Sequence, residues 1–189
     1  MAYLEPGEPL WELLDRLVRE EGLFLYDAER LGGNGVRISI DAQQPEDPHV
    51  TQGEGTGGEA SKERVTSGDC SKVCRRLMVQ LAVEGPAHGL PAEPVIEVSS
   101  PGVYRELRLP QHYRGAIGER VKVFQHAAGG IGNGSTANGR AGKPKGPVVI
   151  GVLRSFEDGA IVVIDEHTSE AVSFELGMVR KANVEFRFE

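Results

Sequence analysis

The segment from Glu97 to Arg108 gathers the residues of this chain that are best suited to binding chemistry. It reads Glu-Val-Ser-Ser-Pro-Gly-Val-Tyr-Arg-Glu-Leu-Arg. Two hydroxyls, Ser99 and Ser100, stand close to two guanidinium groups, Arg105 and Arg108. Hydroxyl and guanidinium groups hydrogen-bond phosphate, and hydroxyls also bond the backbone of turns. The residue types therefore favour a binding segment.

The middle of this segment predicts a sharp corner. A strand that ends near Val98 cannot continue through Pro101, which lacks a backbone N–H group. Gly102 is free to adopt a positive φ, as a tight turn after proline requires. Beyond the corner, Leu107 and Leu109 are available to anchor the two arginines. We expect the corner to join two segments of different character.

The motifs of common enzymes do not fit the sequence. A nucleophile elbow needs glycines on both sides of its serine, whereas Val98 and Pro101 flank the serine pair. A Walker-type phosphate loop needs a serine or threonine after Gly142-Lys143, where the chain has Pro144. No pairing of serine or cysteine with histidine has local support. We therefore predict no enzymatic activity and no cofactor.

The cysteines and the hydropathy predict no metal and no membrane span. Cys70 and Cys74 could be combined with His88 as ligands, but both cysteines fall on the apolar face of an expected helix. Reduced thiols agree with a cytoplasmic location. No stretch approaches the roughly 18 consecutive apolar residues of a membrane helix, and no leader-like segment opens the chain.

The charge of the chain is unevenly distributed. The net charge is −7, but residues 1–100 hold 9 Lys and Arg against 18 Asp and Glu, whereas residues 101–189 hold 12 against 10. No acidic residue lies between Glu119 and Glu157. A basic window of this kind can face phosphate, or it can be a solvated surface without a ligand. The candidate RNA-binding residues are Arg120, Lys122, Arg140, Lys143, Lys145, Arg154 and Lys181.

The first hundred residues predict an α+β domain. Leucines at helical spacing follow Pro9, two strands over 23–29 and 35–41 form a hairpin, and Thr66 with Asp69 caps a second helix. A third strand covers 95–99. We expect a three-stranded sheet with both helices on one face. Residues 42–64 are rich in Gly, Glu, Pro and Gln, and we expect a mobile insertion there.

The second half, residues 101–189, predicts a small β-barrel. A short helical turn over 110–117 precedes strand candidates at 120–124, 148–156, 160–164, 171–174 and 182–186. Several short strands separated by turn residues are typical of an SH3-like or Sm-like barrel. The connection over 126–147 carries seven glycines and three basic residues, and we expect a flexible arm there that either touches nothing or becomes ordered on phosphate.

At the corner, the sequence resembles the ribosome maturation factor RimP family, whose hallmark string stands here at Glu97 to Gly102. Arg105, Leu107, the run 109–113 and Ile117-Gly118 match its continuation. Further matching segments are Arg37 to Asp41, Asp69-Cys70 and Lys181 to Asn183. The likeness covers roughly residues 9–41, 65–124 and 148–184.

The resemblance implies an α+β domain followed by an SH3-like barrel, and a non-enzymatic factor that binds the immature small ribosomal subunit through rRNA and ribosomal proteins. It makes the corner, Ser99, Ser100, Pro101, Gly102, Tyr104, Arg105 and Arg108, the expected partner-binding segment. Tyr104 and Glu106 depart from the Asp and Pro of many relatives. The alternative is an Sm-like RNA-binding regulator, which would form a ring, whereas the assembly factor is expected to be a monomer.

Overall fold

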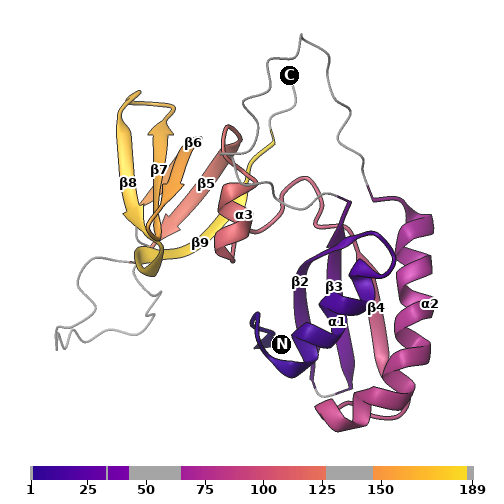
Figure 1. Cartoon of the computed structure of the whole chain (residues 1–189). Helices are drawn as coiled ribbons and strands as arrows, with labels where there is room; N and C mark the ends of the chain where they lie inside the picture. The colour runs from indigo at the N-terminus through magenta and orange to yellow at the C-terminus, as the bar shows by residue number, and fades with distance from the viewer. Residues whose placement is uncertain (1, 33, 43–64, 127–146, 187–189) are drawn as a thin grey trace, which may run out of the picture. The chain divides into compact units, whose positions relative to one another are not determined.

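The computed structural model describes residues 2–32, 34–42, 65–126 and 147–186 of the chain. The polypeptide divides into two compact units, residues 1–102 and residues 103–189 (Figure 1). Each unit is built around one β-sheet. Residues 43–64 of the insertion expected over 42–64 lie outside the described residues, and so do residues 127–146 of the basic arm expected over 126–147.

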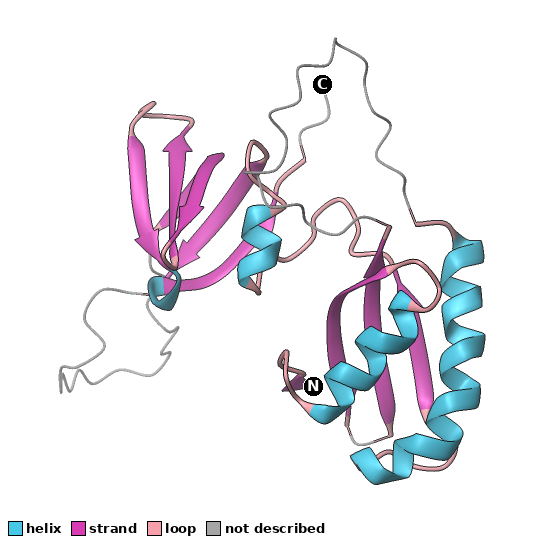
Figure 2. Ribbon diagram, viewed as in Figure 1, coloured by secondary structure: helices cyan, strands magenta, loops and turns pink. Residues whose placement is uncertain are grey.

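The first unit is a four-stranded sheet with helices on one face, as Figure 2 shows. The strands run in the order β1-β2-β3-β4. Its elements are β1 Ala2–Tyr3, α1 Pro9–Arg19, β2 Phe24–Leu31, β3 Gly35–Asp41, α2 Ser67–Glu84, the 3-10 helix η1 Gly85–His88 and β4 Val95–Ser99. The expected three-stranded sheet was incomplete, because the two-residue strand β1 adds a fourth strand by pairing Ala2 with Arg30 and Tyr3 with Glu29.

Helix α1 forms as its sequence predicts. Pro9 occupies the first helical position, where its missing N–H group costs no hydrogen bond. The apolar stripe is buried against the sheet, and Trp11 beside it is only 5% exposed. The buried residues of the helix are Leu10, Trp11, Leu13, Leu14, Leu17 and Val18.

Helix α2 starts at the predicted capping box. The backbone N–H of Asp69 donates to the Thr66 hydroxyl at 3.2 Å, and the Thr66 N–H donates to the Asp69 carboxylate at 2.9 Å. The buried line along the helix is one narrow row of Val73, Leu77 and Leu81, whereas Met78 is 59% exposed. The physical reason is that the helix faces the sheet with one row at i, i+4 spacing.

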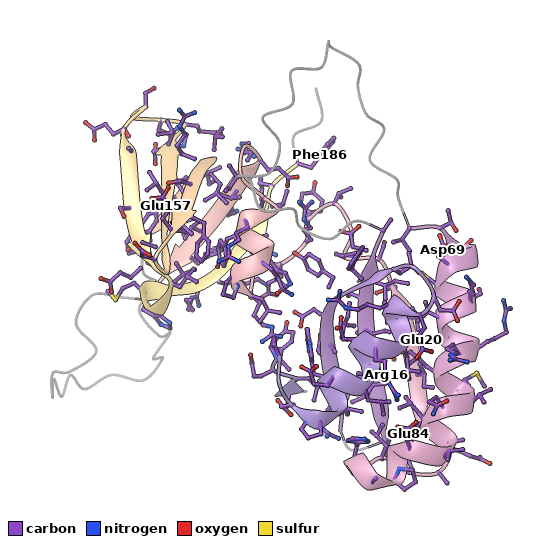
Figure 3. All side chains as sticks on the ribbon, in the orientation of Figure 1. Arg16, Glu20, Asp69, Glu84, Glu157 and Phe186 are labelled. Carbon is purple, nitrogen blue, oxygen red and sulfur yellow. The ribbon has the colours of Figure 1, made fainter. Side chains whose placement is uncertain are left out.

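Ion pairs on the solvent side join the two helices. Arg16 of α1 pairs with Glu84 of α2 at 3.3 Å, and Glu20 at the end of α1 pairs with Arg76. Figure 3 labels Arg16, Glu20 and Glu84 where the helices lie side by side. Each exposed ion pair of this kind contributes little to the free energy of unfolding. Burial of the apolar stripe therefore stabilises the packing of helices on the sheet more than the ion pairs do.

The sheet of the first unit combines a hairpin with one parallel strand. Strands β2 and β3 are antiparallel, and β4 returns through α2 to lie parallel to β3. Gly35 begins β3 where the backbone of Val95 comes so close that a Cβ would meet its carbonyl oxygen at 1.9 Å. Glycine is therefore required at the start of this strand.

The second unit is a five-stranded antiparallel sheet in the order β8-β7-β6-β5-β9. Its elements are α3 Pro110–Arg114, β5 Arg120–Gln125, β6 Val148–Glu157, β7 Ala160–Asp165, β8 Ala171–Glu175, the 3-10 helix η2 Leu176–Met178 and β9 Val179–Val184. The last strand begins at Val179, three residues earlier than the sequence predicted, because η2 turns the chain directly into it.

The core of the second unit comes from alternate residues of its strands. Val121, Val123, Leu153 and Ile161 are almost completely buried, together with Leu107 from the segment before α3. The described strands form no closed barrel, since β8 and β9 are the two edges of the sheet. The α+β class is therefore confirmed, and the structure has two sheets with few helices. No described helix has the length and apolarity that crossing a bilayer demands.

Candidate functional site

The corner begins where β4 ends. Pro101 follows two exposed serines, and Gly102 adopts the left-handed φ of 76° that the sequence predicted. The hydroxyls of Ser99 and Ser100 make no hydrogen bond to the described part of the chain. Within the described residues, neither hydroxyl therefore bonds the corner's own backbone.

Arg105 is held by an acidic residue of its own unit. Its Nη2 donates to both carboxylate oxygens of Glu119 at 2.8 Å. The two side chains are only 21% and 25% exposed, so solvent screens this pair less than a pair on the open surface. In this state the guanidinium group is engaged within the protein.

Residues 105–107 extend the sheet beyond β9. The N–H of Leu107 donates to the Ala182 carbonyl at 2.9 Å, and the N–H of Val184 donates to the Arg105 carbonyl at 3.0 Å. Asn183 donates from its side chain to the carbonyl of Tyr104 at 3.2 Å. This pairing fixes the backbone after the corner and leaves the Tyr104 side chain 50% exposed.

A buried histidine and tyrosine fix the short helix α3. His112 accepts hydrogen bonds at Nδ1 from the N–H groups of Arg108 and Leu109, at 3.1 and 3.2 Å. Tyr113 stacks on Phe156 with ring centroids 5.9 Å apart. Burial, with the nearby charge of Glu106, raises the pKa of Tyr113 to about 12. These contacts hold Arg108 in a half-buried position.

Two residues of the predicted basic set are paired with carboxylates from outside the basic window. Arg120 binds Glu166 at 2.7 Å, and this hydrogen-bonded partner raises the pKa of the guanidinium. Lys181 pairs with Glu106 at 3.3 Å. The stretch without acidic residues is thus partly neutralised in the fold, because Glu166 pairs with Arg120.

The remaining basic candidates differ in their surroundings. Lys122 lies on the outer face of β5 with its Nζ 5.5 Å from the ring centroid of Phe124. Arg154 is exposed on β6. The predictions for Arg140, Lys143 and Lys145 fall outside the described residues.

Phe124 and Arg180, which were not among the predicted site residues, lie beside Lys122. Phe124 lies two positions further along β5, and the Cζ of Arg180 lies 5.7 Å from the centroid of its ring. The alternation of Val121 and Val123 inward with Lys122 and Phe124 outward could have indicated an aromatic ring on the solvent side.

The described residues offer no group of three or more His, Cys, Asp or Glu placed to hold a metal ion. Cys70 and Cys74 are half-buried thiols on α2. Burial raises the pKa of the Cys70 thiol, which makes the thiolate form rarer at neutral pH.

No family model matches the chain, but comparison with known proteins identifies several relatives. A ribosome maturation factor RimP of Albidiferax ferrireducens is 34% identical over 137 residues, which are 72% of this chain and 61% of that protein. Proteins of the same name from Paracidovorax citrulli and a Polaromonas species are 32% and 31% identical, over 72% and 65% of this chain and 64% and 52% of their own length.

The chain thus spans between about half and two thirds of the length of the relatives it matches. The string Glu97 to Gly102, followed by Arg105 and Leu107, carries the likeness read from the sequence. The chain is therefore similar to proteins of the ribosome maturation factor RimP family.

Proposed function

We propose that this protein is a non-enzymatic ribosome assembly factor that binds the immature small (30S) ribosomal subunit and promotes its maturation. The observation that carries the proposal is the similarity to proteins named ribosome maturation factor RimP. The corner string of residues 97–102 is part of that similarity. The partner surface of the subunit consists of rRNA and ribosomal proteins.

The unequal charge of the two halves gives each a different partner in this proposal. Residues 1–100 carry twice as many acidic as basic residues, which suits a basic ribosomal protein. Residues 101–189 carry a small basic excess, which suits RNA. The protein acts as a monomer in the cytoplasm, where ribosomes are assembled.

The proposal also includes an SH3-like barrel for the second unit. Five antiparallel strands, bulges in β6 and β9, and the 3-10 turn η2 between β8 and β9 support a strongly bent sheet. Residues 105–107 add pairing on the outer edge of β9. A bent sheet of this kind presents its outer face as a convex surface to a partner.

Sedimentation of a lysate through a sucrose gradient tests the proposed function. We expect the protein to travel with free small subunits and to be absent from the fractions of large subunits and free RNA. Sedimentation with free RNA alone would contradict the proposal. A measured mass of a ring-shaped oligomer would favour the Sm-like regulator instead.

A further inference from the structure

Phe124 presents an aromatic ring on the outer face of the second sheet. Val121 and Val123 of the same strand point into the core and are at most 1% exposed. Side chains alternate along a strand, so Lys122 and Phe124 lie on the opposite face, where both are half-buried. Cations lie close to the ring, with Lys122 Nζ at 5.5 Å and Arg180 Cζ at 5.7 Å from its centroid.

A β-bulge places the second cation. Phe124 pairs with Lys181, but Gln125 pairs with Val179, so Arg180 is an extra residue in β9. A bulge re-aims the side chain of its extra residue and is often found beside functional surfaces. Here it brings the guanidinium of Arg180 to Phe124, while Ala182 further along β9 stays in the core.

The two cations at Phe124 have no carboxylate partner in the described part of the chain. Other basic residues of the same unit differ in this respect, since Arg120 pairs with Glu166 and Lys181 with Glu106. Positive charge that is not neutralised within the fold is available to an anionic ligand.

Apolar side chains complete the same face. Strand β6 pairs with β5 so that Val148 lies opposite Phe124 and Ile150 opposite Lys122. Val148 and Val152 are 45% and 44% exposed. A surface that combines an aromatic ring, exposed aliphatic groups and uncompensated cations matches single-stranded nucleic acid, whose bases stack and whose phosphates are charged.

We propose that the outer face of β5, β6 and β9 around Phe124 binds a single-stranded RNA segment. One base stacks on the Phe124 ring, and Lys122 and Arg180 hold the phosphates beside it. This inference deepens the proposed function and rests on it, because it names the surface by which an assembly factor would contact RNA.

Binding of a fluorescein-labelled uridine decamer to the 189-residue protein tests the surface by fluorescence anisotropy. Phe124→Leu keeps an apolar side chain but removes the stacking ring, and we expect it to weaken binding about tenfold. Lys122→Gln with Arg180→Gln should weaken binding and reduce the slope of log Kd against log salt by about 1.4, near 0.7 for each phosphate contact.

Arg114→Gln is the matched control. Arg114 also lies over an aromatic ring, with its Cζ 5.6 Å from the centroid of Phe156, but it belongs to α3 and not to this face. We expect it to bind the decamer within about twofold of the unchanged protein, as surface changes away from a contact usually do. Thermal unfolding checks that each variant is folded.

Two results would overturn the inference. One is failure of the unchanged protein to bind the decamer at low salt. The other is unchanged binding by both the Phe124→Leu protein and the double glutamine variant. The double variant alters only surface charge, so it decides the matter if Phe124→Leu does not fold.

Co-sedimentation of the same variants with small subunits separates this inference from the proposed function. Decamer binding that depends on Phe124, in a protein that does not travel with small subunits, would leave the RNA surface standing and overturn the proposed function. Loss of subunit binding by Phe124→Leu with unchanged decamer binding would identify the face as a protein contact and overturn the inference.

Discussion

The buried phenol of Tyr113 makes the stability of the second unit sensitive to alkaline pH. Burial raises its pKa to about 12, against about 10 in an unfolded chain. A raised folded pKa means that the neutral phenol contributes stability below about pH 10, and that this contribution is lost as the pH rises through 12. Tyr113→Phe should therefore flatten the fall in urea-unfolding stability above pH 10. A fall that is equally steep in the variant would contradict this assignment.

The pair of Arg105 with Glu119 is expected to act mainly within the fold. Both oxygens of Glu119 accept from the same nitrogen at 2.8 Å in a largely buried setting. A double-mutant cycle with Arg105→Gln and Glu119→Gln should give a coupling free energy of about 1 kcal/mol in urea unfolding.

The same cycle distinguishes a structural arginine from a contact to a partner. If the coupling is close to zero and only Arg105→Gln weakens binding to small subunits, then Arg105 acts on the partner. If both variants lose stability alike and the coupling is present, then its first role is to hold the segment after the corner beside β5. Either result shows whether Arg105 acts on a partner or within the fold.

At the scale of elements, the capping box is the main determinant of where α2 begins. Thr66 and Asp69 satisfy each other's backbone N–H groups, and the hydrogen bonds from Thr66 lower the pKa of Asp69. Thr66→Ala should cost about 1 kcal/mol of unfolding free energy. Thr66→Ser, which keeps the hydroxyl, is the matched control and should cost much less.

The lowered pKa of Asp69 gives the capping box a pH dependence. A depressed folded pKa means that the carboxylate contributes stability above its unfolded pKa of about 3.9, and that this contribution is lost as the pH falls through the folded value. Asp69→Asn should therefore destabilise the protein at pH 7 and make less difference at pH 3, measured by urea unfolding. An equal cost at both pH values would mean that the charge of Asp69 does not stabilise the helix.

Elements with a local signal were predictable from the sequence, and those set by distant pairing were not. The stripe from Leu10 to Val18 and the capping box depend on residues a few positions apart, so the sequence indicates them directly. Strand β1 has two residues and exists because it pairs with Arg30 and Glu29. The early start of β9 depends on the turn η2 before it and on the pairing of Val179 with Gln125 of β5.

At the scale of the whole molecule, long-range pairing explains why the sequence predicted the candidate site only in part. The basic window has no acidic residue in sequence, yet folding brings Glu166 to Arg120 through sheet pairing. The pairing of β5 with β9 adds Arg180 to Lys122 and Phe124, since this cation reaches the ring through a bulge that no local pattern predicts. Long-range register therefore decides which charges remain available to a partner.

The two compact units lead to a prediction for the isolated second half. Its core cluster is built only from residues between Leu107 and Val184, so the sheet buries its apolar face without help from residues before 103. Residues 103–189 alone should unfold cooperatively in urea. A shorter fragment, residues 110–189, lacks Leu107 and its hydrogen bond to Ala182 and should be less stable by at least about 2 kcal/mol, the lower range for loss of a buried leucine. Non-cooperative unfolding of the longer fragment would show that the second unit needs the first, and equal stability of both fragments would show that the segment after the corner is not part of its core.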